Sequence, residues 1–74
     1  MVIMAKRLGI IGGAQLGMLI TEAAKNLSEY ISEITVLDQT ENCPAAQAGA
    51  KQIVGDFKDE LAILKLAEQS DIIK

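Results

Sequence analysis

The sequence predicts an α/β domain built on a parallel sheet, with its elements in the order β-α-β-β-α-β. One observation and one general rule lead to this prediction. Short apolar runs alternate along the chain with segments whose apolar residues recur at helical spacing. As a rule, strands that alternate with helices of this length pair in parallel through right-handed crossovers. Because the chain has only 74 residues, we expect a single small domain with a thin core.

The first strand is expected at residues 8–11, inside the apolar stretch 2–11. Leu-Gly-Ile-Ile is the nearly continuous apolar run of a strand that is buried on both faces. The period then changes, and the spacing predicts a helix over residues 15–27. Its expected core-facing side consists of Leu16, Leu19, Ile20, Ala23 and Leu27. The opposite side is polar and is formed by Glu22, Lys25 and Asn26.

A second strand is predicted at residues 34–37, where a β-branched run ends at Asp38. Residues 39–50 have a loop-like composition, and Asn-Cys-Pro at 42–44 is their strongest turn signal. The alanine-rich segment 45–50 is compatible with one helical turn.

A third strand is expected at residues 52–54, closed by Gly55, and a fourth begins at 72–73. Between them, residues 59–69 have helical spacing, and the expected core-facing side consists of Leu61 and Leu64 with Ala67 or Glu68. Carboxylates gather where this helix starts and complement the positive end of its dipole; they belong to Asp56, Asp59 and Glu60. The chain ends as the fourth strand begins, so we expect a fragment of a larger protein.

A glycine-rich loop between the first strand and the first helix is the most informative segment. It consists of Gly12, Gly13, Ala14, Gln15, Leu16 and Gly17. Compared with the dinucleotide-binding pattern G-x-G-x-x-G, it has alanine at the second glycine position. The first glycine permits a tight turn, the last permits close packing of helix on strand, and free amides at the helix start attract an anion. These features predict half of a Rossmann-like domain.

Asp38 lies 21 residues after Gly17, at the end of the second strand. In dinucleotide-binding domains an acid at this place binds a ribose hydroxyl, so a module for NAD(P) or FAD is one interpretation. Two others remain open: glycines that merely turn the chain without binding a ligand, and an aspartate that caps the following turn.

Composition excludes several other classes. Seven basic residues against ten acidic ones give a net charge of −3, and only two residues are aromatic, so no nucleic-acid partner is expected. One cysteine and no histidine exclude an internal disulfide and argue against a zinc site. No apolar run is long enough for a membrane span, so we expect a cytoplasmic protein with no membrane partner.

Cys43 and the pair formed by Asp56 and Asp59 invite functional interpretations that the sequence does not favour. With no histidine in the chain to activate it, Cys43 is expected to be a packed loop residue rather than a nucleophile. A role at the helix start explains both aspartates without a metal. We therefore expect no catalytic residue and no metal ligand in this chain.

Five segments in order resemble one enzyme family, the ATPase subunit of phosphoribosylaminoimidazole carboxylase, also called 5-(carboxyamino)imidazole ribonucleotide synthase. The resemblance covers almost the whole chain. The segments are LGIIGGAQLG at 8–17, VLDQT at 36–40, NCPAAQ at 42–47, VGDFKD at 54–59 and LAEQSDII at 66–73.

The resemblance implies membership of the ATP-grasp superfamily, whose members of this kind use ATP to carboxylate aminoimidazole ribonucleotide with bicarbonate in purine biosynthesis. It places residues 1–74 as an N-terminal pre-ATP-grasp domain, without the ATP-grasp and C-terminal domains. It also implies that the glycine loop, together with Asp38, faces the ribonucleotide and its phosphate. The residues that hold ATP and Mg²⁺ in the family lie downstream, so the isolated chain is expected to be inactive.

The chain departs from the family pattern at several places. The family usually has a third consecutive glycine where this chain has Ala14, an arginine near Met18, and proline where this chain has Gln39. The segment 28–32 is longer than the family's usual helix-to-strand turn. The related formate-dependent glycinamide ribonucleotide transformylase is an alternative within the same superfamily. As partners we expect the missing domains, the ribonucleotide and a second copy of the chain, because a half-domain exposes apolar surface.

Overall fold

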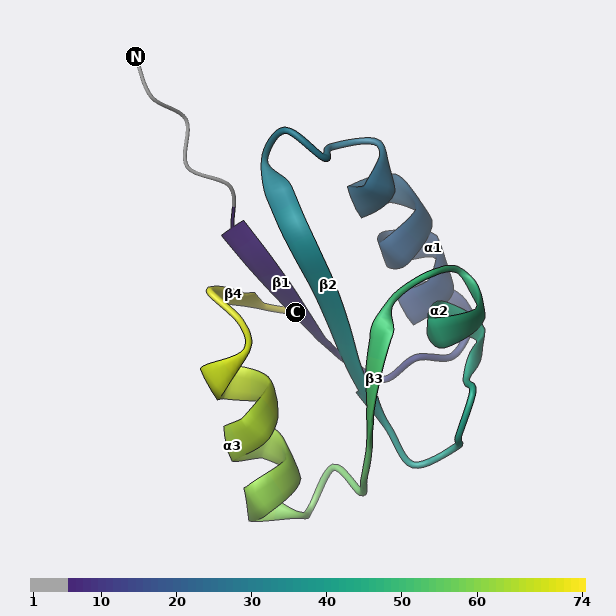
Figure 1. The fold of residues 1–74 in the computed structure, drawn as a ribbon. Helices are drawn as coiled ribbons and strands as arrows, with labels where there is room; N and C mark the ends of the chain where they lie inside the picture. The colour runs from purple at the N-terminus through teal and green to yellow at the C-terminus, as the bar shows by residue number, and fades with distance from the viewer. Residues whose placement is uncertain (1–5) are drawn as a thin grey trace.

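The computed structural model describes residues 6–74, and its elements follow the predicted order with one short helix added (Figure 1). The strands are β1 (Lys6–Ile11), β2 (Ile31–Asp38), β3 (Lys51–Val54) and β4 (Ile72–Ile73). The helices are α1 (Gln15–Lys25), α2 (Pro44–Gln47) and α3 (Glu60–Glu68). The part of the predicted apolar stretch before residue 6 lies outside the described residues.

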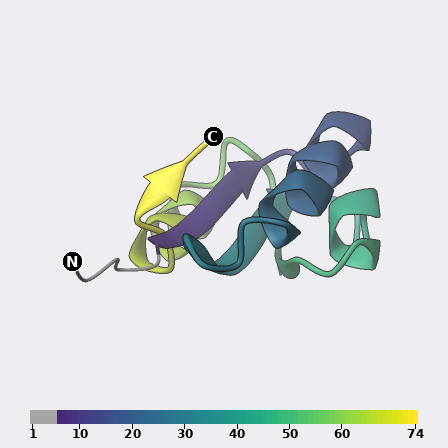
Figure 2. The same cartoon turned by 90° about the horizontal axis from the view of Figure 1, so that it is seen from above.

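The four strands form one sheet in the order β3-β2-β1-β4, and every neighbouring pair is parallel. Helices α1 and α2 cover one face of this sheet and α3 covers the other, as the view from above shows (Figure 2). The predicted α/β class and parallel sheet are therefore confirmed. Because all strands run the same way, the loops that follow β1, β2 and β3 leave from a single edge, where ligands bind in open α/β sheets.

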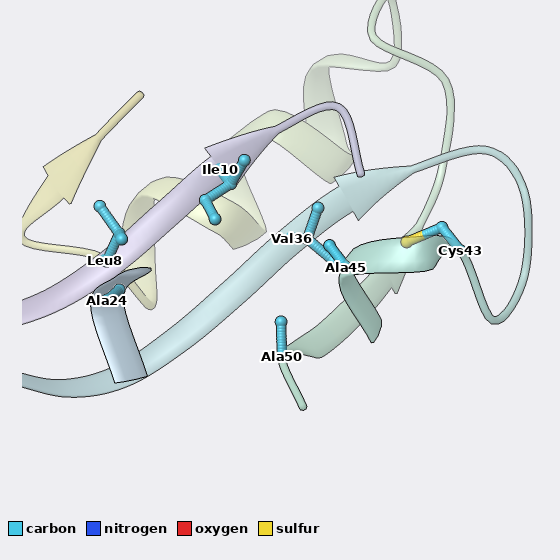
Figure 3. Packing of buried hydrophobic residues seen from close by; sticks show 7 residues of the cluster. All are labelled: Leu8, Ile10, Ala24, Val36, Cys43, Ala45 and Ala50. Carbon is cyan, nitrogen blue, oxygen red and sulfur yellow. The ribbon is translucent and has the colours of Figure 1, made fainter. Parts of the chain in front are cut away.

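Two small hydrophobic clusters hold the helices on the sheet. The first lies between β1, β2, α1 and α2 (Figure 3) and consists of Leu8, Ile10, Ala24, Val36, Cys43, Ala45 and Ala50. The second lies on the opposite face and consists of Leu37, Ala62 and Leu66. On the helix side of the first cluster the buried residues of α1 and α2 are the alanines Ala24 and Ala45, so these helices lie close to the sheet, whereas α3 contributes Ala62 and the larger Leu66 to the second.

The predicted core-facing side of α1 is wrong. Leu16 is 71% exposed, and Leu19 and Leu27 also project into solvent, whereas the buried residues of the helix are Gly17, Thr21 and Ala24. Only Ile20 of the predicted set packs against the core, as a partly buried residue. The helix is rotated because Gly17 lies against the carbonyl oxygen of Gly12, where a Cβ would collide with that oxygen.

The predicted side of α3 is wrong in the same way. Leu61 and Leu64 are exposed, and the helix contacts the sheet through Ala62 and Leu66. Close packing again sets the rotation, since a Cβ on Gly55 would lie 2.8 Å from the Cβ of Ala62. The predicted role of Asp59 is confirmed: it is the N-cap residue, and its Oδ1 accepts the amides of Leu61 and Ala62.

Some boundaries differ from the predicted ones. Helix α1 ends at Lys25, because the amides of Asn26 and Leu27 bond to carbonyl groups three residues earlier and tighten the chain into a turn. Strand β2 begins at Ile31 rather than residue 34, since its polar start pairs with the beginning of β1. The helical turn that the composition of segment 45–50 allowed is present as α2, but it starts one residue earlier, at Pro44.

An exposed ion pair attaches β4 to β1. The Arg7 guanidinium donates to both carboxylate oxygens of Asp71, at 3.1 and 3.3 Å, and the Arg7 amide donates to Asp71 Oδ2 at 2.8 Å. The Asp71 amide returns a bond to the Arg7 carbonyl oxygen at 2.7 Å. These hydrogen bonds hold the pKa of Asp71 below its usual value. The start of β4 is thus fixed to the sheet by side-chain and backbone bonds together.

No helix within residues 6–74 has the length and apolar character that crossing a membrane requires.

The observed rotation of α3 predicts a large loss of stability when one of its leucines is truncated and almost none when another is. Leu66→Ala removes a fully buried side chain, so we expect a loss of about 2–5 kcal/mol in the free energy of unfolding. Leu64→Ala removes the same atoms from a side chain that is 57% exposed, and the change is expected to stay within about 0.5 kcal/mol. Urea unfolding followed by circular dichroism measures both values. Equal shifts of the two midpoints would contradict the observed rotation of α3.

The Arg7 contacts predict how Asp71 titrates. Because the pKa of Asp71 is lowered in the folded state, its contribution to stability is present above the ordinary aspartate pKa of about 3.9 and is lost as the pH falls through the lower folded value. We expect carboxyl ¹³C NMR to show the lowered pKa, and Arg7→Ala to raise it. Lys58→Ala removes an equal charge from the loop at the opposite end of the sheet and serves as the control; an equal response to both variants would refute the local explanation.

Candidate functional site

The predicted site lies at the edge of the sheet where β1, β2 and β3 end (Figure 1). The loop 12–17 connects β1 to α1, and Asp38 is the last residue of β2, the neighbouring strand. Although 21 residues separate Asp38 from Gly17 in the sequence, parallel pairing brings Asp38 beside the start of the loop. The structure therefore brings all seven predicted site residues into one region.

Gly12 makes the turn off β1. Its φ of 94° lies in the left-handed region that favours glycine, and its amide donates to the carbonyl oxygen of Leu37 at 2.9 Å. The Gly12 carbonyl oxygen lies against Gly17, the last glycine of the loop. The two structural roles predicted for these glycines, a tight turn and a close approach of helix and strand, are both confirmed.

Gly13 is held on three sides. Its amide donates to Asp38 Oδ2 at 2.8 Å, and its carbonyl oxygen accepts the amide of Ala45 at 2.9 Å. The Sγ of Cys43 fills the space where a Cβ on Gly13 would lie. Cys43 is 1% exposed, so it is a packed loop residue as predicted. The two hydrogen bonds and the contact with the sulfur together prevent Gly13 from rotating.

The four amides that follow Gly13 have no acceptor within residues 6–74. They belong to Ala14, Gln15, Leu16 and Gly17. Ala14 is the N-cap residue of α1, and its methyl side chain cannot accept the hydrogen bond that a polar cap would take. Helix α3 differs, because its own Asp59 caps it. The start of α1 therefore carries partial positive charge that the described part of the chain does not neutralise.

Asp38 uses both carboxylate oxygens within the protein. Oδ2 accepts the Gly13 amide, and Oδ1 accepts the amide of Thr40 at 2.8 Å. The bonds from Thr40 and Gly13 lower the pKa of Asp38, so the side chain is a carboxylate at neutral pH. With 9% of its surface exposed, Asp38 presents little to a ligand. Its contacts are those of a residue that organises the loop.

Sequence reasoning missed three neighbours of the loop. Ala45 and Cys43 contact Gly13 from the segment that follows β2, where the sequence indicated a turn, one helical turn and a packed cysteine but no contact with the glycine loop. Phe57, in the loop after β3, is 45% exposed, and its Cζ lies 3.9 Å from the position of a Cβ on Gly12. The sequence contained one usable signal for these contacts, which is the common direction of the three parallel strands.

A hollow in the described surface lies away from the glycine loop. It has a volume of about 380 Å³ at the opposite end of α1, and its lining includes Lys25, Ser28, Glu33 and Lys51. Lys25 donates to the Ala48 carbonyl oxygen and Lys51 pairs with Glu33, so both ammonium groups already have partners. None of the predicted site residues lines this hollow, and the unoccupied amides make the glycine loop the stronger candidate site.

Within residues 6–74, no three histidine, cysteine, aspartate or glutamate side chains gather as they would around a metal ion. Asp56 Oδ1 accepts the Lys58 amide, and Asp59 caps α3, so both members of the candidate aspartate pair have backbone partners. The residues described here do not form a set suited to Mg²⁺.

Comparison with known proteins shows that the chain is similar to one segment of N5-carboxyaminoimidazole ribonucleotide synthases. N5-carboxyaminoimidazole ribonucleotide synthase of Brucella melitensis is 41% identical over 66 residues, which are 89% of this chain and 17% of that protein. The crystal structure of the Thermotoga maritima synthetase matches 92% of this chain and 18% of its own, with a TM-score of 0.84 and 41% identity. An ADP complex of such a synthetase matches 99% of this chain and 19% of its own, with a TM-score of 0.85 and 42% identity.

This chain thus spans less than a fifth of the length of the relatives that it matches. A model of the ribonucleotide synthetase preATP-grasp domain matches residues 4–74, which is nearly the whole chain. This chain belongs to the ribonucleotide synthetase preATP-grasp domain family, since that model covers nearly all of it.

Proposed function

We propose that this chain is the substrate-side domain of an ATP-dependent ligase that carboxylates aminoimidazole ribonucleotide with bicarbonate. In this proposal the loop 12–17 binds the 5′-phosphate of the ribonucleotide. The names of the relatives support the reaction, and the solved relative with bound ADP supports the use of ATP by the whole enzyme. The chemistry of the loop supports the assignment of the phosphate to this domain.

The row of four unoccupied amides at the start of α1 is the observation that carries the proposal. Backbone amides and the helix dipole both favour an anion at such a place, and a phosphate ester offers several acceptor oxygens to them. Ala14 and Gln15 are exposed, so a ligand can reach the amides from solvent. The methyl group of Ala14 narrows the approach to the amides, but it accepts no hydrogen bond from them and leaves them open.

A dinucleotide-binding module is the less favoured function. That function would use Asp38 to bind the hydroxyl groups of a ribose. Both oxygens of Asp38 already accept backbone amides, and the side chain is almost buried. The same contacts leave the phosphate-binding function intact, because a phosphate needs only the amides beyond Gly13. The geometry therefore favours a sugar phosphate over NAD(P) or FAD.

ATP, Mg²⁺ and the bicarbonate-activating step belong, in this proposal, to domains that this chain does not contain. The relatives are more than five times longer than the matched segment, which leaves room for an ATP-grasp region and a C-terminal domain. The part played by the described residues is to bind and orient the ribonucleotide. Its exposed leucines on α1 and α3 are surfaces that those domains or a second copy would cover.

Titration with ribose 5-phosphate tests the proposed phosphate site. In ¹⁵N NMR we expect the amides of residues 14–17 to shift and to saturate, whereas ribose without phosphate leaves them unchanged. Ala14→Asp places a carboxylate at the N-cap, where it accepts the free amides and repels a phosphate. We expect this variant to lose phosphate binding while its melting temperature rises.

The opposite effects on binding and stability separate a blocked site from a damaged fold. Ala14→Gly is the matched control, since it removes the methyl group without adding charge, and it should bind ribose 5-phosphate at least as tightly as the unchanged chain. If Ala14→Asp bound the sugar phosphate as well as the unchanged chain does, the assignment to these amides would be wrong.

An ATPase assay tests the proposed division of labour. We expect the 74-residue chain to show no ATP hydrolysis stimulated by aminoimidazole ribonucleotide, because its sequence has no recognisable ATP site and residues 6–74 hold no group of side chains suited to Mg²⁺. The intact Brucella melitensis synthase serves as the positive control. Turnover by the 74 residues alone would refute the assignment of ATP chemistry to other domains.

A further inference from the structure

We propose that Asp38 is a positioning residue: its carboxylate sets the orientation of the glycine loop and does not itself bind the ligand. This inference rests on the proposed phosphate site and refines it, because it gives Asp38 a role different from the ribose-binding role that its spacing suggests. Asp38 fixes one peptide plane of the loop, and that plane determines what lies next to the start of α1.

Asp38 determines the orientation of the peptide between Gly12 and Gly13. Its Oδ2 accepts the Gly13 amide at 2.8 Å, within a buried contact. In a planar trans peptide the carbonyl oxygen and the next amide hydrogen point in opposite directions. The Gly12 carbonyl oxygen must therefore point away from Asp38, and it lies against Gly17. The carboxylate thus helps to set the distance between the end of β1 and the start of α1.

The next peptide is fixed by the same principle. The Gly13 carbonyl oxygen accepts the Ala45 amide at 2.9 Å, so the Ala14 amide points away from α2 and toward the open side of the loop. Cys43 packs on Gly13 and prevents it from shifting. Asp38, Ala45 and Cys43 therefore hold Gly13 from three directions, and only the Asp38 contact is a hydrogen bond to a charged group.

The second oxygen of Asp38 makes the carboxylate rigid. Oδ1 accepts the amide of Thr40 at 2.8 Å, two residues along the chain, and the Asp38 carbonyl oxygen accepts the amide of Gly55 at 3.1 Å. Both ends of the residue are thereby anchored to loops at the same edge of the sheet. Two amide donors also offset the negative charge of Asp38, which reduces its repulsion of a phosphate bound to the neighbouring amides.

Inorganic phosphate distinguishes positioning from direct contact. If Asp38 acts through the loop, Asp38→Ala weakens the binding of inorganic phosphate and of ribose 5-phosphate by the same factor, about tenfold for the loss of one hydrogen bond to a charged group. If Asp38 binds ribose hydroxyls directly, Asp38→Ala weakens only ribose 5-phosphate. The titrations use the 74-residue chain and ¹⁵N NMR shifts of residues 14–17.

Hydrogen exchange of the Gly13 amide gives a readout that needs no ligand. We expect exchange at this amide to accelerate at least tenfold in Asp38→Ala. Asp38→Asn retains one carbonyl acceptor without the charge, so it should restore part of the protection and part of the phosphate affinity. Thermal unfolding of each variant shows whether it is folded at the temperature of the titration, and Asp38→Asn provides the comparison should Asp38→Ala unfold.

Each outcome has a defined meaning. Equal weakening for both ligands, together with faster Gly13 exchange, supports the positioning role. Unchanged phosphate affinity in a folded Asp38→Ala chain, or weakening confined to ribose 5-phosphate, overturns it. If the unchanged chain binds neither ligand, the proposed phosphate site is refuted. If the Gly13 amide exchanges no faster in Asp38→Ala than in the unchanged chain, only the positioning role of Asp38 is refuted.

Discussion

The contact between the Gly12 carbonyl oxygen and Gly17 is the constraint on which much of the structure depends. It brings α1 so close to the end of β1 that no side chain fits between them. Helix α1 must then face the sheet through its small residues, and the leucines at its apolar spacing lie in solvent. The same approach places the free amides of the helix at the edge of the sheet. Packing and the proposed binding site thus have one common cause.

The described core is thin, because its buried hydrophobic residues form two separate clusters that have no residue in common. One cluster lies between the sheet and the pair α1 and α2, and the other consists of only three buried residues under α3. Several leucines remain exposed on both helices. In the proposed function, these apolar side chains are the surface that meets further domains, because the solved relatives are more than five times longer than this chain.

The acid at the end of β2 illustrates how one sequence spacing supports different chemistry. In a dinucleotide-binding domain this position is used for a ribose hydroxyl. Here the carboxylate accepts amides from Gly13 and Thr40, and little of its surface remains exposed. The spacing of Asp38 shows that it reaches the loop. Only the directions of the neighbouring amides show which of its oxygens are already occupied.

The fold class, the order of the main elements, the parallel sheet and the position of the glycine loop could all be predicted from the amino-acid sequence, because they depend on local periodicity and on backbone conformations that glycine alone adopts readily. So could the N-cap role of Asp59, which is a contact over three residues. The buried faces of α1 and α3, the end of α1 and the surroundings of Gly13 could not be predicted, because they depend on contacts between residues far apart in the chain. Apolar spacing indicates that a helix has an apolar side, but a close contact beside the end of a strand sets its rotation, and at both helices that contact involves a glycine, Gly17 against Gly12 and Gly55 against Ala62.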